Sequence, residues 1–438
     1  MRTYYATFGC KVNQCETENI RQRLSQLNFV ETDKIEEAEL CIVNSCTVTA
    51  QSDLKCRQFM HKVKKVNPCC AILLRGCMPQ ALQDVAKSLF DKRQCDIVVG
   101  NKSLEETIAS AVSYRKNRER AFTISKHEMG ENFDSFQNGE FTQKTRAYVK
   151  IQDGCDQYCS YCIIPFARGH MRSRKLIEIR SEIERLSQSG HKEIILVGIN
   201  LCCYGKDFDD GTRLIDAIET ACSVTGIERV RLGSIEPEML LDSDIDRMAK
   251  LENLCPQFHL SLQSGCDKTL KAMNRKYSVS EYAELCQKLR TAFPDCSITT
   301  DIMVGFPGET EEDFDESLRF VERIGFAQAH IFPYSQRIGT AAAGRAMQIE
   351  KAEKKRRAEK MLSVCNESSK DFLTKMVGKT VKVLFEKENC TTFHQGYSEN
   401  YTLVKIHREN VQKSLRRKSF YVIIEEVADG YCIGRITD

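Results

Sequence analysis

The sequence predicts an α/β protein built from a parallel α/β sandwich, a partial β/α barrel and a small OB-like β-barrel, in that order. Short apolar runs alternate with helical patterns up to about residue 122. Six further strand–helix repeats follow between residues 147 and about 340, and several short strands fill the C-terminal region. Alternation of this kind favours parallel sheets covered by helices. We therefore expect domains at residues 1–122, 147–374 and 375–438, with a polar linker at 123–146.

The composition is that of an ordinary cytoplasmic protein. The chain has 438 residues, of which 42% are hydrophobic and 29% charged, and it is long enough for more than one core. No apolar run approaches a membrane span, and the N-terminus lacks a signal-peptide core, so we expect no membrane partner. The net charge is only +3, so any binding of nucleic acid must come from local patches. In a reducing compartment the 22 cysteines are thiols or metal ligands rather than disulfides.

The first domain should be a parallel sheet with helices on both faces. Its predicted strands are Thr3–Phe8, Leu40–Asn44, Ala71–Arg75 and Asp96–Val99, and its predicted helices are Glu16–Leu27, Asp53–Val66, Gln80–Leu89 and Leu104–Arg115. Cys10, Cys46 and Cys77 each follow one of the first three strands, so they should share the sheet edge where ligands bind. Spacing alone supports a metal site and unrelated core cysteines equally. Cys15, at a helix entry, is expected to be packed.

The second domain should be the partial barrel, with its chemistry at the carboxyl ends of the strands. Its predicted strands are Ala147–Gln152, Glu193–Ile199, Arg229–Ile235, Phe258–Leu262, Ser297–Val304 and Ala329–Pro333. Cys155, Cys159 and Cys162 follow the first of these strands with the spacing C-x3-C-x2-C. Iron–sulfur clusters take cysteine sulfur as their ligand, and a cubane held by three thiolates keeps one iron open. The motif therefore predicts such a cluster.

This motif, with Tyr161 before its last cysteine, resembles the signature of radical S-adenosylmethionine (SAM) enzymes. The longer string Gly-Cys-Asp-Gln-Tyr-Cys-Ser-Tyr-Cys-Ile-Ile-Pro-Phe-Ala-Arg-Gly at residues 154–169 is similar to their methylthiotransferase branch, as are residues 260–277 and 299–310. The string Phe-Gly-Cys-Lys-Val-Asn-Gln at residues 8–14 is similar to the sub-branch that acts on threonylcarbamoyladenosine in tRNA. The resemblance covers nearly the whole chain.

The resemblance implies two [4Fe–4S] clusters and SAM as cofactors. One cluster would be held by Cys155, Cys159 and Cys162, and the second by the other three cysteines, Cys10, Cys46 and Cys77. Tyr161 would lie near the adenine of SAM. Glycine or polar residues at later strand ends would line the rest of the SAM site, since glycine permits close backbone approach; these are Gly198, Asn200, Glu236, Gln263 and Gly305.

The implied reaction converts N6-threonylcarbamoyladenosine, next to the anticodon of a tRNA, into its 2-methylthio derivative. A 5′-deoxyadenosyl radical would abstract hydrogen from C2, the second cluster would deliver sulfur, and another SAM would supply the methyl group. The expected partners are tRNA, SAM, a sulfur donor and an electron donor such as flavodoxin or ferredoxin. Two alternatives remain open: the same chemistry on isopentenyladenosine or on an aspartate of a ribosomal protein, and a non-catalytic iron–sulfur electron carrier or RNA-binding protein.

The C-terminal region should be a small barrel that resembles a TRAM domain. Its predicted strands are Lys379–Glu386, Tyr401–Ile406, Phe420–Glu425 and Tyr431–Ile436. Its basic and aromatic residues would suit single-stranded RNA; they are Lys405, His407, Arg408, Lys413, Arg416, Arg417, Lys418, Tyr397, Tyr401 and Phe420. Far in sequence from both cysteine sets, this barrel is expected to recruit tRNA without taking part in the radical step.

Two further groups of side chains carry expectations. Arg168, Arg172, Arg174 and Lys175 follow the cluster motif, and they are either a solvated helix start or a group that meets an RNA backbone or a carboxylate. His170, His259 and His330 are expected to be isolated and structural.

Overall fold

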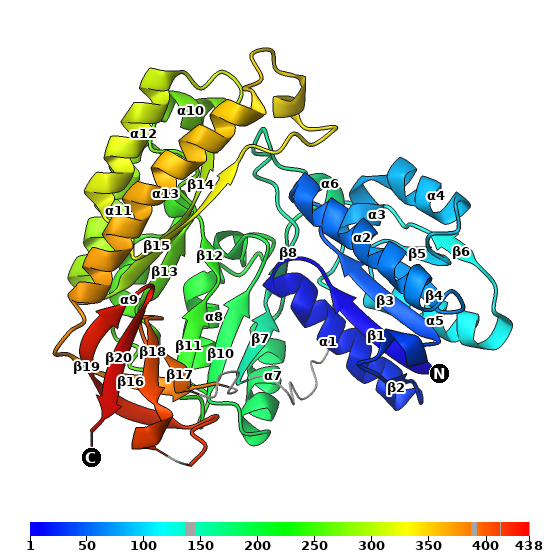
Figure 1. Cartoon of the computed structure of the whole chain (residues 1–438), viewed down its shortest axis with the longest axis horizontal. Coiled ribbons are helices and arrows are strands. Elements are labelled where there is room, and N and C mark those ends of the chain that lie inside the picture. Colours follow the sequence, from blue (N-terminus) through cyan, green and yellow to red (C-terminus); the bar gives the residue numbers. More distant parts are fainter. Residues whose placement is uncertain (136–144, 387–391, 412, 438) are drawn as a thin grey trace.

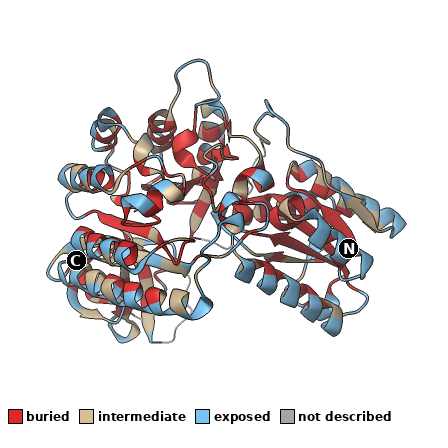
Figure 2. Cartoon of the chain, turned by 90° about the horizontal axis from the view of Figure 1, so that it is seen from above, coloured by how far each residue is buried: buried red, intermediate tan, exposed pale blue. Residues whose placement is uncertain are grey.

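The computed structural model describes residues 1–135, 145–386, 392–411 and 413–437. The predicted fold class is confirmed: two parallel α/β regions lie beside each other, and a small closed barrel ends the chain (Figure 1). Figure 2 shows that the strands of both regions form a buried interior, while the surrounding helices are buried on one side only. Within the described ranges, no helix combines the length and apolar character needed to cross a membrane.

The first region is a six-stranded sheet in the order β2-β1-β3-β4-β5-β6, with every neighbouring pair parallel. Its strands are β1 (Arg2–Thr7), β2 (Val30–Glu31), β3 (Leu40–Ser45), β4 (Ala71–Gly76), β5 (Ile97–Val99) and β6 (Ala121–Thr123). Its helices are α1 (Lys11–Gln26), α2 (Ala50–Val66), α3 (Cys77–Ala81), α4 (Gln83–Asp91) and α5 (Leu104–Asn117), with a 3-10 turn η1 (Ile35–Glu37). Helices α1 and α5 pack on one face of the sheet, and α2 and α4 pack on the other.

Helix starts and edge strands differ most from the predicted elements. Helix α1 begins at Lys11, earlier than predicted, because Gly9 at φ +143° turns the chain directly after β1. Its first turn carries Asn13, a buried polar residue that breaks the apolar pattern. The predicted helix Gln80–Leu89 is two helices that meet at Leu82. Strands β2 and β6 are too short to give an apolar pattern.

The first part of the predicted linker packs against the sandwich. Gln80 donates from Nε2 to the Ser125 carbonyl at 3.0 Å, and the backbone N–H of Leu104 donates to Asp134 Oδ2 at 2.9 Å. Residues 136–144 of the predicted linker lie outside the described residues.

The second region has two parallel sheets, β7-β10-β11 and β12-β13-β14-β15. Its strands are β7 (Arg146–Lys150), β8 (Gln152–Asp153), β9 (Arg172–Ser173), β10 (Glu193–Val197), β11 (Arg229–Leu232), β12 (Ser234–Ile235), β13 (Gln257–Leu260), β14 (Ser297–Val304) and β15 (Gln328–Pro333). Strands β11 and β12 are separated by Gly233 alone, so together they form the third of the six predicted barrel strands. One core runs through both sheets, which makes them a single partial barrel.

The helices of this region cover the outside of the partial barrel, except for α6, which packs against α3 of the first region. They are α6 (Ile164–Arg168), α7 (Leu176–Gln188), α8 (Leu214–Cys222), α9 (Asp242–Met248), α10 (Asp267–Ala272), α11 (Val279–Ala292), α12 (Glu311–Ile324) and α13 (Lys351–Thr374), with 3-10 turns η2 (Leu201–Cys203), η3 (Pro237–Met239) and η4 (Ala341–Gly344). The long helix α13 packs beside α12 and along β15, and then leads into the last region (Figure 1).

The C-terminal region is a closed five-stranded barrel in the order β16-β17-β18-β20-β19. Its strands are β16 (Thr380–Phe385), β17 (Phe393–Ser398), β18 (Leu403–His407), β19 (Ser419–Ala428) and β20 (Tyr431–Ile436), with a 3-10 turn η5 (Arg408–Asn410). Four of these strands were predicted. Strand β17 was not, because the residues it buries are His394, Gly396 and Ser398 rather than apolar side chains.

Buried arginines join this small barrel to the amino ends of the partial-barrel strands. Glu193, at the start of β10, lies 3.5 Å from Arg229 and 3.2 Å from Arg231. The two guanidinium groups donate onward to backbone carbonyls of the C-terminal barrel, at Lys382, Tyr397, Ser398 and Glu399. Arg229 and Arg231 are each about 1% exposed, so the contact is part of the protein interior.

Candidate functional site

The loop that carries Cys155, Cys159 and Cys162 folds back on itself between β8 and α6. The Cys155 N–H donates to the Gly169 carbonyl at 3.1 Å, and the Cys162 N–H donates to the Cys159 carbonyl at 2.9 Å. A Cβ at Gly154, where φ is +71°, would come within 1.9 Å of a backbone oxygen, so only glycine fits there. Burial raises the pKa of Cys155 to about 11 and that of Cys162 to about 12. A metal cluster would therefore have to displace protons from these thiols.

Cys10, Cys46 and Cys77 lie at one edge of the first sheet. Cys10 caps α1, Cys46 directly follows β3, and Cys77 begins α3 directly after β4. A Cβ built on Gly9 would lie 2.8 Å from Cys46 Cβ, which shows how closely the first turn approaches the second. Burial raises the pKa of Cys46 to about 12, with further contributions from the thiols of Cys77 and Cys10. The structure thus brings this set of three cysteines together across the sequence.

The donor chemistry of both sets fits iron–sulfur clusters. Across the described ranges, no group of three or more His, Cys, Asp or Glu side chains converges on a single metal ion. In a cubane each cysteine binds a different iron, so its thiols do not converge in that way. Cys15 lies inside α1, with its Sγ 3.6 Å from the Tyr148 carbonyl of the partial barrel, and it is packed, as predicted.

A buried charge network connects the two sets of cysteines. Arg168, on α6 just after the cluster loop, donates from Nε to Sγ of Cys77 at 3.3 Å. The same guanidinium forms ion pairs with Glu16 on α1 and with Asp153, two residues before Cys155. Arg168 is 1% exposed. The network therefore spans the contact between the sandwich and the partial barrel.

The carboxylates of this network are held ionised by their partners. Burial alone would raise the pKa of Glu16, but the positive charges of Arg168, Lys150 and Arg75 outweigh it and lower that pKa. The pKa of Asp153 is lowered in the same way against its burial, chiefly by Lys150 and Arg168. Buried charges that are paired on several sides strongly resist removal of one partner.

The arginines after the cluster motif were expected to be a solvated helix start or to meet an RNA backbone or a carboxylate, and in the structure they pair with carboxylates. Arg168, Arg172 and Arg174 are all buried. Arg172 donates to the carbonyls of Arg168 and His170, each at 3.0 Å, and Arg174 pairs with Glu182 of α7. These side chains fix the cluster loop and α7 rather than an external partner.

Two predicted SAM contacts present unsatisfied polar atoms, which is the feature a bound ligand would explain. Asn200 Oδ1 and Gln263 Oε1 are buried, and neither has a hydrogen-bond partner within the protein. Asn200 Nδ2 lies 3.9 Å from Cys155 Sγ. Gln263 adopts φ +66°, an unusual conformation for a residue other than glycine. These acceptors fit a ligand with amino or hydroxyl donors, such as SAM.

Three other residues predicted to contact SAM pack against side chains of the protein. Gly198 is close-packed, because a Cβ there would lie 2.9 Å from Gln152 Oε1. Tyr161 packs against an apolar group that includes Phe306 and Tyr334. Gly305, at φ +71°, lies against the side chain of Lys354 on α13.

Arg275 is a site residue that the sequence analysis missed. Its Nη1 lies 3.4 Å from Cys159 Sγ, and its Nη2 pairs with the carboxylate of Glu236. Burial raises the pKa of Glu236, while the charge of Arg275 acts in the opposite direction. The available signal was the string Met-Asn-Arg-Lys-Tyr at residues 273–277, which resembles the methylthiotransferases.

A cavity of about 450 Å³, here called the central cavity, opens where the three regions meet. Its walls come from the start of α1, from inward-facing positions of the partial-barrel strands, and from Tyr401 of the C-terminal barrel. The lining includes Cys10, Lys11, Val12, Val197, Gly198, Arg231, Gln257, His259, Thr299, Asp301, Gln328, His330 and Tyr401. A cysteine of one set, Cys10, and a predicted SAM contact, Gly198, thus share one compartment.

The expectation that His170, His259 and His330 are isolated is wrong. The rings of His259 and His330 lie 6.1 Å apart on neighbouring strands of the cavity wall. His259 Nε2 is 3.3 Å from Asp301 Oδ2, and His170 Nδ1 is 2.6 Å from Asp156 Oδ1.

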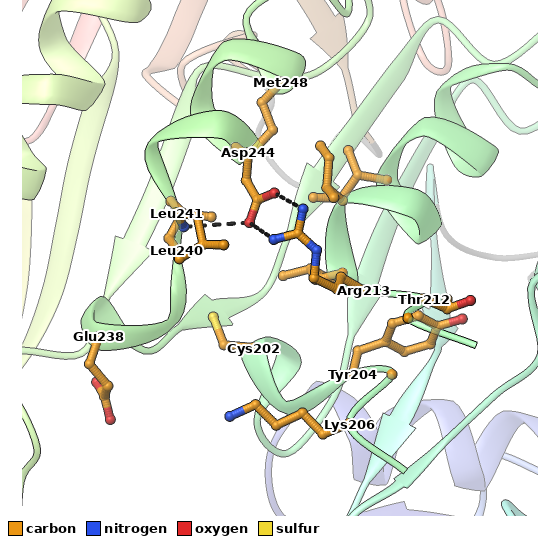
Figure 3. A pocket seen from close by; sticks show the side chains of 15 residues that line it. Cys202, Tyr204, Lys206, Thr212, Arg213, Glu238, Leu240, Leu241, Asp244 and Met248 are labelled. Carbon is orange, nitrogen blue, oxygen red and sulfur yellow. Dashed lines mark hydrogen bonds and ion pairs between the residues drawn. The ribbon is translucent and has the colours of Figure 1, made fainter. Parts of the chain in front are cut away.

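A second cavity, of about 420 Å³, lies between η2, α8 and α9 (Figure 3). The ion pair between Arg213 and Asp244, 2.9 Å apart, spans its upper wall, and Cys202, Tyr204 and Glu238 line the rest. Its lining includes none of the residues predicted for the site.

The residues predicted to bind RNA do not form a single surface on the C-terminal barrel. Tyr397 and Tyr401 stack on each other 4.5 Å apart and face Arg146 of the partial barrel, and Phe420 packs beside Phe385. A different set gathers on β17, β18 and β20. The residues of this set, here called the aromatic–basic patch, are Phe393, Lys405, His407 and Tyr431.

Comparison with known proteins agrees with this arrangement. The Radical SAM superfamily matches residues 149–321, and a family described as Uncharacterized protein family UPF0004 matches residues 2–100. The radical S-adenosylmethionine methyltransferase TsrM from Kitasatospora setae has a similar fold, with a TM-score of 0.56 at 11% identity over 78% of this chain and 74% of that one.

Sequence relatives cover almost the whole chain. The threonylcarbamoyladenosine tRNA methylthiotransferase MtaB of Thermotoga maritima is 37% identical over 90% of this chain and 89% of its own, and the Bacillus subtilis MtaB is 33% identical over 91% and 89%. The tRNA-2-methylthio-N(6)-dimethylallyladenosine synthase of Acetivibrio thermocellus is 35% identical over 87% and 79%. The chain therefore belongs to the radical SAM methylthiotransferases, a family of transferases, and groups with the MtaB branch.

Proposed function

We propose that this protein is a tRNA methylthiotransferase that converts N6-threonylcarbamoyladenosine into its 2-methylthio derivative. The observation that carries this proposal is that Cys10 of one cysteine set and Gly198, a predicted SAM contact, line one cavity. Arg168 connects Cys77 to the opposite cluster loop. A reaction that joins sulfur to a carbon activated elsewhere needs both centres within reach of one substrate.

Each cysteine set has its own role in the proposal. Cys155, Cys159 and Cys162 would hold a [4Fe–4S] cluster with one iron open to SAM, and Cys10, Cys46 and Cys77 would hold the second cluster. When bound, the clusters and SAM supply reductive cleavage of SAM and the radical chemistry that replaces a C–H bond by a C–S bond.

The protein's part is to position SAM and to shield the reaction. The unpaired oxygens of Asn200 and Gln263 would accept hydrogen bonds from SAM. Arg275 would stay fixed beside Cys159 by its ion pair with Glu236. Tyr161 would pack near the adenine, and Gly198 and Gly305 would allow close backbone approach. Enclosure by three regions of the chain would keep water from the reacting atoms.

The proposal also names the partners. The substrate is tRNA, by analogy with the relatives named above, and the reaction needs a sulfur donor and an electron donor such as flavodoxin or ferredoxin. Because tRNA is the substrate, we place the activity in the cytoplasm.

The test is a product assay with two matched RNAs. Anaerobically reconstituted protein is supplied with reductant, SAM, sulfide and an anticodon stem-loop that carries either threonylcarbamoyladenosine or isopentenyladenosine, and the digested nucleosides are analysed by mass spectrometry. We expect the 2-methylthio product from the first RNA. Product from the second RNA alone would contradict the substrate. If the protein contains both clusters but forms no product from either RNA, a non-catalytic iron–sulfur protein would be favoured.

A further inference from the structure

Polar residues line the central cavity on the walls away from Val12 and Val197. Strands β13, β14 and β15 contribute side chains at alternating positions, including Gln257, Thr299 and Gln328. Alternation along parallel strands directs these positions to one face, which here is the inside of the partial barrel. An apolar substituent would form no hydrogen bonds with these groups, whereas a polar substituent could.

The acidic groups near the cavity already have polar neighbours within the protein. Asp301 Oδ2 lies 3.3 Å from His259 Nε2, and Thr299 Oγ1 is 3.0 Å from Nδ1 of the same ring. Glu193, just behind the wall, is surrounded by three arginines.

The two cations of the wall differ in how they are bound. Arg231 is fully engaged: its Nε is 3.2 Å from Glu193 Oε1, its Nη1 is 2.9 Å from the Glu399 carbonyl, and its guanidinium lies 4.6 Å from the ring centre of Tyr401. Lys11, the first residue of α1, is exposed and lines the cavity. In the part of the chain that the structure describes, no hydrogen bond or ion pair engages its ammonium group. The cavity therefore offers one free positive charge.

We infer that Lys11 binds the carboxylate of the threonylcarbamoyl group and thereby selects this substrate. The inference rests on the proposed function. A threonyl substituent carries a carboxylate, a hydroxyl and urea-type N–H and C=O groups, which match one ammonium and several neutral polar side chains. Gln257, Thr299 and Gln328 can share the hydroxyl and urea groups. A dimethylallyl substituent has none of these groups and would leave Lys11 unpaired.

The first experiment needs no variant. Wild-type reconstituted protein is given stem-loop RNA with threonylcarbamoyladenosine or with its carboxyl methyl ester, which removes the charge and adds one methyl group. We expect esterification to raise KM and the Kd measured by fluorescence anisotropy by about 10- to 100-fold, the range for one charge-assisted hydrogen bond. Equal KM and Kd for acid and ester would overturn the inference.

The second experiment assigns the effect to Lys11. The variant Lys11→Met should bind the acid as weakly as the ester, while Lys11→Arg should keep part of the preference for the acid. The control Lys62→Met removes an exposed lysine from α2 of the same region and should keep the full preference. A Lys11→Met variant that still prefers the acid would overturn the assignment.

Two further readouts separate the possible failures. Iron content and SAM cleavage without RNA should match wild type in Lys11→Met, because Lys11 adjoins Cys10 but is not a proposed ligand. If this variant loses iron, the ester comparison with wild-type protein decides the inference. If wild-type protein modifies the acid and the ester equally, the proposed function stands and only the role of Lys11 falls. If it modifies neither RNA but accepts isopentenyladenosine, the proposed function falls with it.

Discussion

Arg168 donates from Nε to Sγ of Cys77 at 3.3 Å, although the two residues lie in different α/β regions. Its Nη1 also pairs with Glu16 of the sandwich and lies 3.4 Å from Asp153 of the partial barrel. One guanidinium therefore interacts with both regions at their interface. Arginine suits this position because its planar group presents several donors in a fixed geometry. One side chain therefore contacts a cysteine of the first set and the strand that leads into the loop of the second.

Replacing Arg168 by Met should destabilise the protein by about 3–5 kcal/mol, because it leaves two buried carboxylates short of a partner. Thermal and urea unfolding under anaerobic conditions measure this loss. Arg168→Lys should recover part of it, and the double variant Glu16→Gln/Arg168→Met should be less destabilised than the sum of its single changes. Additive effects would show that the network is not coupled.

The two cysteine sets should separate in an iron assay. Replacing Cys155, Cys159 and Cys162 by Ala should remove about half the iron and abolish SAM cleavage, because three cysteines define each proposed cluster. Full iron content in this variant would refute the ligand assignment.

The other set should behave differently. Replacing Cys10, Cys46 and Cys77 by Ala should also remove about half the iron, yet SAM cleavage should continue while methylthio product disappears. Product formation at the wild-type rate would rule out a sulfur-delivery role for this set.

Glu193 should make stability depend on pH on the acid side. Burial alone would raise its pKa, but Arg231, Arg146 and Arg229 outweigh this and lower it. A carboxylate whose pKa is lower in the folded state stabilises the protein fully above its unfolded pKa of about 4.3, and this contribution is lost as pH falls through the folded pKa.

The Glu193→Gln variant should therefore be less stable than wild type at neutral pH, and the difference should narrow only as the pH falls below ~4, through the folded pKa of Glu193. Thermal melts across the acid range measure the difference. Glu359→Gln, an exposed change on α13, serves as the control and should follow the wild-type profile. A constant difference at every pH would contradict the role of Glu193.

The aromatic–basic patch should contact tRNA by charge and by stacking. Lys405 Nζ lies 3.5 Å from the ring centre of Tyr431. Lys405→Ala should weaken tRNA binding and reduce the slope of log affinity against log salt by about 1. Phe393→Ala should weaken binding with little change in slope, because stacking depends less on salt. Anisotropy titrations at several salt concentrations test both, with Lys370→Ala on α13 as the control.

If both patch variants bind tRNA with unchanged affinity, the tRNA-binding surface lies elsewhere on the protein. Deleting the whole C-terminal barrel is a poorer test, because Arg229 and Arg231 would lose the carbonyls that they bind.

Tyr401 of the C-terminal barrel also lines the central cavity. That this barrel recruits tRNA without taking part in the radical step stays a prediction.

The cysteine sets could be located from the sequence because their positions follow local rules. Cys10, Cys46 and Cys77 end successive strands, and parallel strands bring their carboxyl ends to one edge. For the second set, the close spacing of the cysteines is by itself enough to predict a cluster site.

The residues around the cysteines could not be assigned in this way. Arg168 looks like a surface arginine, since arginine is rarely buried unless it is paired, and its partner Glu16 is distant in sequence. The central cavity could not be predicted from the sequence either, because Lys11, Arg231 and Tyr401 come together only when all three regions have assembled. Strand β17 escaped notice because its inward positions hold His394, Gly396 and Ser398.

Tyr401 in the cavity wall has a consequence for synthesis in the cell. The ribosome delivers the N-terminal regions first, and domains generally fold as units during translation. Both sets of cysteines therefore leave the ribosome well before the residue that completes the cavity. The wall of the central cavity is complete only when the last barrel has been made, so truncated translation products carry both cysteine sets without it.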